Sequence, residues 1–311
     1  MGRHPFEAQA FTLGSRHEEA LATVLAAVAP LGPETIPLVE ATNRILVAAI
    51  TTPTHTIPSG HPLRPQELAL LAAHGFSELV VVRRPRVAII ATGDELLPPG
   101  APPVPGKIYD SDSVLLAALV RRDGGMPLPI GIAHDSVSSL RIRLATALAR
   151  GAELILTAAG SHHGEHDIVR TLIAQEGRLY FWQVAMEPDR PLLFGDLASV
   201  PVISLPGDPA EALICAELFV RPTLLRLAGH TELARPTVRA ALTAPVTRHP
   251  NRHYLRGMVQ HAGEGYVVCP DGDGHGVEAV FAEANALVVI PPGEGEIPAG
   301  SAVEALLIER V

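Results

Sequence analysis

Four short segments rich in small and acidic residues each follow a strand-like apolar run. They are residues 92–95, 109–113, 157–167 and 205–209. In a doubly wound sheet, ligands bind at the carboxyl ends of the strands. Small residues let backbone amides approach an anion, and a following helix N-terminus favours negative charge. The segments therefore indicate a site for a phosphorylated small molecule. The residues we single out as substrate contacts are Thr92, Gly93, Asp94, Asp110, Ser111, Thr157, Gly160, Ser161, Pro206, Gly207 and Asp208.

Several carboxylates in these segments are of the type that binds Mg²⁺, which prefers carboxylates, water and substrate oxygens. They are Glu95, Asp110, Asp112 and Asp167. The same residue types also cap helices, so both interpretations stay open at this point. The run HHGEHD at 162–167 matches no standard zinc spacing. We expect it to be a solvated loop with some ligand contacts.

Composition and missing motifs exclude several protein classes. A formal charge of −9 argues against nucleic-acid binding, which needs a basic face. The sequence has no GxSxG elbow, no phosphate-binding GxxxxGK[ST] loop and no GxGxxG after a strand. No apolar run approaches the ~20 residues of a membrane span. We expect a soluble, cytoplasmic protein without nucleic-acid or membrane partners.

The order of predicted elements indicates three regions. Strands and helices alternate over residues 83–228, which predicts an α/β fold with a doubly wound, mostly parallel sheet. Residues 1–82 contain two predicted helices, 17–30 and 65–76, and form a helical linking or dimerisation region. Residues 229–311 read as short strands between Gly, Pro and Asp, which indicates a small barrel or sandwich.

Five segments, in chain order, resemble the MoeA / gephyrin E-domain family of molybdopterin molybdenumtransferases. They read TGDEL, IYDSDS, TAAGSHHGEHD, AMEPDRPLLFG and LPGDPAEAL. The family usually has TGDEL, IRDSNS, TSGGVSVGDYD, AMKPGKPLAFG and LPGNPVSAL. The resemblance covers nearly all of residues 18–311. It implies a molybdopterin-binding α/β domain, a helical linking region, a C-terminal β-barrel domain and a homodimer.

The resemblance also implies a reaction, in which molybdate is inserted into adenylylated molybdopterin and the adenylate is hydrolysed. Molybdopterin and molybdate are then substrates, and Mg²⁺ is the cofactor. By this resemblance Glu95, Asp135 and Asp167 are candidate catalytic residues, and Glu95 and Asp167 are candidate metal ligands.

The chain departs from the family in two places. The family's inserted mixed domain, which opens with a motif like PPFDNSAMDGYA, is missing after Pro58. The two lysines of the family's MKPGKP fall on Glu187 and Arg190, and the serine of GNPVS falls on Glu211. Each wrong-sign charge within ~4–6 Å of a dianion costs on the order of 1 kcal/mol or more. We therefore expect weakened molybdate binding at this altered oxyanion pocket, with pterin binding better retained.

Three functions remain open at this point. The first is a divergent molybdopterin-binding homologue with impaired molybdate insertion. The second is a non-catalytic carrier, chaperone or scaffold for molybdenum cofactor, whose partner is a molybdoenzyme or another protein of cofactor synthesis. The third is an active transferase that takes its missing elements from a partner chain.

Overall fold

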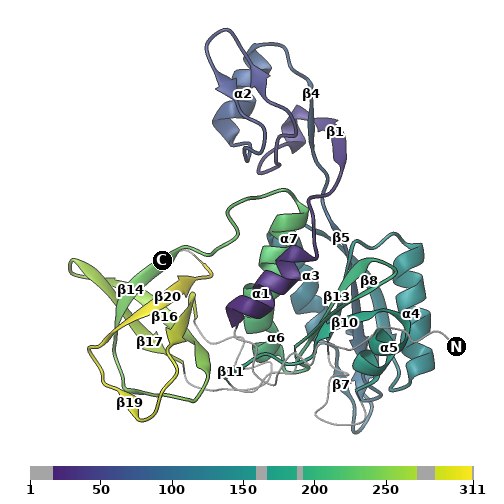
Figure 1. Cartoon of the computed structure of the whole chain (residues 1–311), viewed down its shortest axis with the longest axis vertical. Coiled ribbons are helices and arrows are strands. Elements are labelled where there is room, and N and C mark those ends of the chain that lie inside the picture. Colours follow the sequence, from purple (N-terminus) through teal and green to yellow (C-terminus); the bar gives the residue numbers. More distant parts are fainter. Residues whose placement is uncertain (1–16, 159–166, 188–191, 272–283, 310–311) are drawn as a thin grey trace, which may run out of the picture.

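The structure is a computed structural model that describes residues 17–158, 167–187, 192–271 and 284–309. It contains an α/β body, a barrel beside it, and a small lobe (residues 33–82) that projects from the body (Figure 1). The chain enters and leaves the lobe through two adjacent segments, and the Arg83 N–H donates to the Gly32 carbonyl at their base.

The α/β body is built on a six-stranded sheet of order β10-β12-β13-β9-β5-β8. Four neighbouring strands are parallel, and among the six only β12 runs against the others. The predicted mostly parallel sheet is therefore confirmed. The strand bounds are β5 Arg86–Thr92, β8 Met126–Ala133, β9 Leu154–Ala158, β10 Arg178–Phe181, β12 Leu193–Leu197 and β13 Val200–Leu205.

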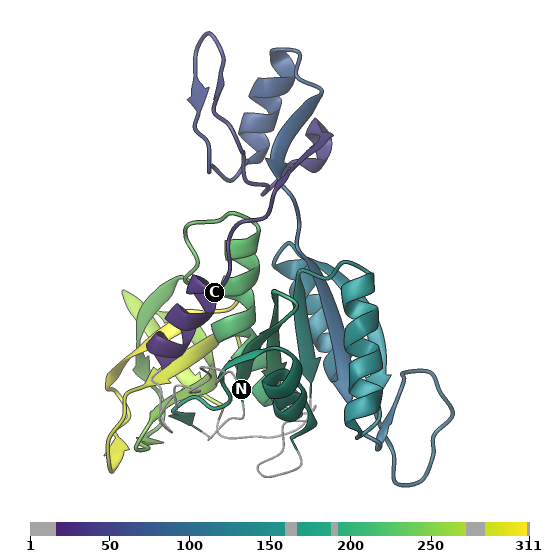
Figure 2. The same cartoon turned by 45° about the vertical axis from the view of Figure 1, so that its right-hand side comes forward.

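Helices cover both faces of this sheet (Figure 2). One face packs against α3 (Asp112–Arg122) and a long helix made of α6 (Pro209–Cys215), the π-helical η2 (Ala216–Val220) and α7 (Arg221–Leu227). The other face packs against α4 (Val137–Ala149) and α5 (Ile168–Glu176).

The helices that follow β5 and β9 lie on opposite faces of the sheet, because α3 belongs to one core and α5 to the other. Since β5 and β9 are neighbours, their following loops diverge at their carboxyl ends. Such a switch point is where ligands of open α/β sheets bind. We refer to the carboxyl ends of β5, β8, β9 and β13 as the carboxyl edge.

The C-terminal region is a closed barrel, which decides between the two predicted architectures. Five strands pair in a ring, and the pairing of β16 with β18 closes it. Closure leaves no free strand edge. The ring consists of β14 (Thr237–Leu242), β16 (Arg252–Ala262), β17 (Gly265–Pro270), β18 (Ala286–Ile290) and β20 (Ala302–Leu307). A short pair, β15 (Val246–Thr247) and β19 (Glu296–Ile297), extends from it.

The lobe mixes helix and strand and has its own small core around Leu63 and Leu71. The sequence predicted its helix α2 (Pro65–Ala73), where Glu67 accepts the Arg64 N–H at 2.6 Å and caps the first turn. Its strands were not predicted, because the proline-flanked run PETIP hides any alternation. The remaining elements are β1 (Pro33–Pro37), η1 (Leu38–Glu40), β2 (Ile50–Thr51), β3 (Thr56–Ile57) and β4 (Glu78–Val82).

Helix α1 (His17–Ala26) packs against the long helix of the body rather than joining the lobe. Ala20 and Val24 are buried there with Leu224. Among the helices that the structure describes, none is both long enough and apolar enough to cross a membrane.

Candidate functional site

The segment after β5 forms a tight turn at the carboxyl edge. Thr92 is buried, and its hydroxyl donates to the Ala158 carbonyl at 3.4 Å, which ties the ends of β5 and β9 together. The Gly93 N–H donates to the Ala133 carbonyl of β8 at 3.1 Å. A Cβ at Gly93 would lie 2.6–2.7 Å from the Glu95 carboxylate, so that side chain folds back over the glycine. A side chain at position 93 would need the space that the Glu95 carboxylate now occupies.

Asp94 and Asp135 bind each other across the ends of β5 and β8. The Asp94 N–H donates to Asp135 Oδ2 at 3.1 Å, and the Asp135 N–H lies 3.4 Å from Asp94 Oδ1. His134 Nδ1 lies 2.8 Å from the same Asp94 oxygen, and Lys107 donates to the Asp94 carbonyl. The His134 hydrogen bond, followed by the Asp135 N–H, lowers the pKa of Asp94. Asp135 thus shapes the turn, and His134 and Lys107 were not predicted from the sequence.

The second segment lies directly beside the first. Strands β6 (Leu96–Leu97) and β7 (Ile108–Tyr109) pair in parallel, and the Asp110 N–H donates to the Leu97 carbonyl at 2.8 Å. Asp110 Oδ1 accepts the Ser113 N–H at 2.9 Å, so this buried carboxylate caps the start of α3. Ser111 stands between them as the residue that precedes the helix.

Asp112 shows that the second and fourth segments meet. Its side chain is buried, and Oδ1 has no hydrogen-bond partner within the described residues. Burial, and then the nearby charges of Asp110 and Asp208, raise the pKa of Asp112 to about 7. The family stretch IRDSNS has asparagine at this position. A neutral Asp112 is similar to that asparagine in shape and in lacking charge.

The third and fourth segments each begin a helix with an aspartate cap. Asp167 accepts the Arg170 N–H at 2.8 Å, and Asp208 accepts the N–H groups of Ala210 and Glu211 at 2.9 and 3.2 Å. Pro206 and Gly207 connect β13 to the second of these caps.

Two buried hydroxyls lie side by side just before these loops, because Thr157 of β9 and Ser204 of β13 are register partners. Neither has a hydrogen-bond partner within the part of the chain that the structure describes. Ser204 was not predicted from the sequence. Gly160, Ser161 and Arg190, and most of the histidine-rich run, lie outside the described residues.

The altered oxyanion residues come from two different elements. Glu187 lies on β11 (Met186–Glu187), which pairs with β16 of the barrel, and it accepts a hydrogen bond from Asn251 Nδ2 at 3.1 Å. Glu211 lies in the first turn of α6. Glu187 therefore lies where the barrel meets the α/β body, and Glu211 lies on the body itself.

Strand β16 adds residues that the sequence analysis missed. His253 is the register partner of Glu187, and Arg256 is buried with Nη2 3.5 Å from Asp271 Oδ2. The signal that could have revealed them is a histidine and an arginine within the otherwise apolar strand HYLRGMV, because a buried arginine needs a specific partner.

The titration of Asp112 contributes a loss of stability as the pH rises. Below about pH 4 its carboxyl is neutral in the folded and the unfolded chain. Between about pH 4 and pH 7 only the unfolded chain releases the proton, so the free energy of unfolding falls by up to ~4 kcal/mol. Asp112→Asn lacks this titration. In urea unfolding, the free energy of unfolding of the variant should therefore rise relative to that of the wild type from pH 4 to pH 8.

The control for that comparison is Glu264→Gln, at an exposed position in the turn between β16 and β17. Its difference from the wild type should not change over the same pH range. A gap between Asp112→Asn and the wild type that stays constant with pH contradicts the assignment.

Comparison with known proteins places this geometry in a family. Residues 88–226 match the family described as probable molybdopterin binding domain. Residues 239–308 match the family described as MoeA C-terminal region (domain IV). The MoeA protein structure from Pyrococcus horikosii has a TM-score of 0.81 and 21% identity, and the match covers 96% of this chain and 100% of that one.

Curated relatives give the same answer. Molybdopterin molybdenumtransferase 2 of Mycobacterium tuberculosis is 36% identical over 266 residues, which cover 83% of this chain and 64% of that protein. The chain thus spans less than two thirds of that relative. Molybdopterin molybdenumtransferase of Nostoc sp. is 31% identical over 313 residues, which cover 90% of this chain and 70% of that protein. The chain belongs to the MoeA / gephyrin E-domain family of molybdopterin molybdenumtransferases.

Proposed function

We propose that this protein binds molybdopterin or its adenylate at the carboxyl edge and acts in molybdenum cofactor biosynthesis, with molybdate insertion impaired. One observation carries the proposal. The residues that match the family's pterin-side motifs lie together at the switch point of the sheet. Thr92 links the ends of β5 and β9, and the charges of Asp110 and Asp208 raise the pKa of Asp112. A ligand at this edge contacts loops from four strands at once.

The edge offers polar groups suited to a phosphorylated heterocycle. Gly93 has no side chain of its own and the Glu95 carboxylate lies over it, so a ligand at this turn meets that carboxylate. The Thr157 and Ser204 hydroxyls carry unused hydrogen-bonding capacity, and Asp112, when neutral, is a hydrogen-bond donor. These groups favour recognition of ring nitrogens and oxygens as well as phosphate.

The carboxylates fit Mg²⁺ only together with the ligand. Within the described residues no three His, Cys, Asp or Glu side chains come together as a metal site. Asp110 and Asp167 each use a carboxylate oxygen to cap a helix. Mg²⁺ is commonly held by one or two carboxylates plus substrate phosphates, so Glu95 and Asp167 would complete such a set with the bound ligand. When bound, the ion supplies charge neutralisation at the phosphate.

The oxyanion pocket supports impaired insertion. Glu187 is half-buried between the body and the barrel, and Glu211 occupies the first turn of α6. The family has a lysine and a serine at these positions. For a dianion such as molybdate, two added carboxylates oppose binding by on the order of 1 kcal/mol each or more.

A second candidate function is a non-catalytic carrier, chaperone or scaffold for molybdenum cofactor. The observation that favours it is the same pair of glutamates, because they weaken the molybdate side while the pterin side is kept. Its partner would be a molybdoenzyme or another protein of cofactor synthesis. Transfer of bound cofactor to an apo-molybdoenzyme supports this function, and no transfer from a loaded protein contradicts it.

Anaerobic calorimetry tests the binding proposal. The wild type should bind molybdopterin with Mg²⁺ present. Gly93→Ala should weaken that binding about tenfold or more, because a φ of +153° at Gly93 is a conformation that costs a residue with a Cβ roughly 1–3 kcal/mol, and the new methyl group also displaces the Glu95 carboxylate. Gly265→Ala is the matched control, since no atom lies within 4 Å of a Cβ there.

No binding of molybdopterin or its adenylate by the wild type would falsify the proposal. Equal losses in the two glycine variants would mean that the turn at Gly93 does not face the ligand. Efficient molybdate-dependent conversion of adenylylated molybdopterin contradicts the impaired-insertion part alone.

Restoring the family residues tests the charge argument. The double variant Glu187→Lys with Glu211→Ser should bind molybdate at least about tenfold more tightly than the wild type, as measured by calorimetry. Glu264→Lys is the control, because it changes net charge as much as Glu187→Lys does but at an exposed turn. A similar gain in molybdate affinity in the double variant and in the control shows a general charge effect. No gain in the double variant means that the oxyanion pocket lies elsewhere.

We also propose a homodimer, as the resemblance implies. Its support is that the lobe leaves several large apolar side chains exposed, and a second chain that covered them would remove them from water. The exposed side chains are Val39, Val47, Phe76 and Val80. Light scattering should give the mass of two chains, and Val39→Asp with Val80→Asp should lower it. A single-chain mass for the wild type at micromolar concentration contradicts this proposal.

A further inference from the structure

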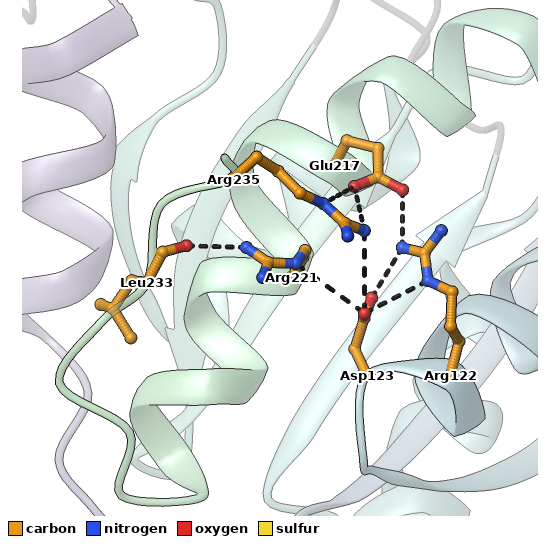
Figure 3. A network of polar contacts seen from close by, with 6 residues as sticks. All are labelled: Arg122, Asp123, Glu217, Arg221, Leu233 and Arg235. Carbon is orange, nitrogen blue, oxygen red and sulfur yellow. Dashed lines mark hydrogen bonds and ion pairs between the residues drawn. The ribbon is translucent and has the colours of Figure 1, made fainter. Parts of the chain in front are cut away.

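A buried charged network joins the α/β body to the segment that leads into the barrel (Figure 3). Its centre is Glu217 on η2, whose side chain is 1% exposed. Arg122 at the end of α3 donates to one Glu217 carboxylate oxygen at 2.6 Å. Arg235 donates to the other through Nε at 3.0 Å and Nη2 at 2.8 Å. Glu217 thus holds two guanidinium groups from opposite sides.

Arg235 belongs to the linker (residues 229–236), which runs from α7 to β14. A second arginine holds the same linker by its backbone, because Arg221 Nη1 donates to the Leu233 carbonyl at 2.7 Å. Asp123 lies beneath both, 3.8 Å from Arg221 Nε and 3.9 Å from Arg235 Nη2. The linker is therefore held at two points, two residues apart, by groups of the α/β body.

These two points lie directly before the barrel. Strand β14 begins at Thr237, and the Pro236 carbonyl accepts the Leu307 N–H of β20 at 2.8 Å. A shift of Arg235 therefore moves the first residues of the barrel ring. On its other side the barrel contacts the body through the β11–β16 pairing and through an ion pair between Glu18 and Arg252. Tyr254 of the barrel is also buried in the same hydrophobic core as α7.

The chemistry of the network is better suited to fixing the orientation of the linker than to stabilising the fold. A guanidinium that donates from two nitrogens to a carboxylate fixes direction as well as distance. Buried ion pairs contribute little net stability relative to apolar packing, and a specific geometry is their better attested use. Glu217 also lies in a π-helical turn, a local irregularity that often occurs at functional sites.

We propose that Glu217 is a positioning residue that, through Arg235 and with Arg221, fixes where the barrel stands relative to the carboxyl edge. The barrel carries Asn251 and His253 beside Glu187, whereas the pterin-side groups lie on the body. The network thereby sets the separation between the two parts of the candidate site. Its effect on the site rests on the proposed function, but the positioning itself does not.

The distribution of distances between two spin labels tests this. Cys269 on β17 is exposed and takes one label, Cys215 is buried, and Ala145→Cys on α4 provides the second. Pulsed electron resonance should give a narrow distribution in this background. Glu217→Ala and Arg235→Ala should each broaden it about twofold or more. Arg235→Lys should restore it only in part, because a lysine cannot donate in the paired geometry.

Arg239→Ala is the matched control, since this arginine is exposed on β14 and makes no ion pair within the described residues. It should leave the distribution unchanged. If Glu217→Ala does not fold, Arg235→Ala and Arg235→Lys decide, because they alter only the linker side. Unchanged widths in folded variants, whatever their melting temperatures, overturn the proposal.

The outcomes for positioning and for function are separable. Broader distributions with weaker binding of adenylylated molybdopterin or molybdate support both. If the variants broaden the distribution but the wild type binds neither ligand, the positioning is established and the proposed function is removed. Narrow distributions in variants that lose ligand binding remove the positioning and retain the function.

Discussion

The structure depends on one packing constraint, the burial of the two central parallel strands, β5 and β9, on both faces. Strands β5 and β9 are buried along almost their whole length, so helices must cover each face and every connection must return to the same end. The carboxyl edge then collects all four connecting segments in one place. Residues far apart in the sequence, such as Asp112 and Asp208, come close enough there for their charges to interact.

That concentration also determines the electrostatics of the edge. Asp110, Asp167 and Asp208 cap helices, and burial, with the charges of Asp110 and Asp208, raises the pKa of Asp112 to about 7. A cap stabilises its helix by accepting backbone N–H groups, but it uses the donors that an anion would otherwise take. An anionic ligand at this edge therefore depends on a counter-ion, on the turn at Gly93, and on the unused hydroxyls of Thr157 and Ser204.

Much of the α/β body could be predicted because its local signals agree with its tertiary role. The run RVAIIAT became β5 with the expected bounds, and Asp167 begins α5 as its composition suggests. Partners that are distant in the sequence could not be predicted, because their contacts depend on register. His134 beside Asp94, Ser204 beside Thr157 and Asn251 beside Glu187 are all of this kind. The π-helical turn was hidden too, since an apolar run such as LICAELFV reads equally well as a continuous α-helix.

The departures from the family gain meaning from where these residues lie. Glu187 stands between body and barrel, so the charge there acts on whatever the barrel brings toward the edge. A family member that lacks the inserted domain has fewer surfaces to enclose a ligand. The placement of the barrel then carries more of the task of excluding water and strengthening polar contacts. The linker that Glu217 and Arg221 hold is short, and its anchored Arg235 lies two residues before Thr237, so its geometry passes directly to β14. Under the proposed function, the retained half of the site lies on the sheet, and the altered half depends on how firmly the barrel is held against it.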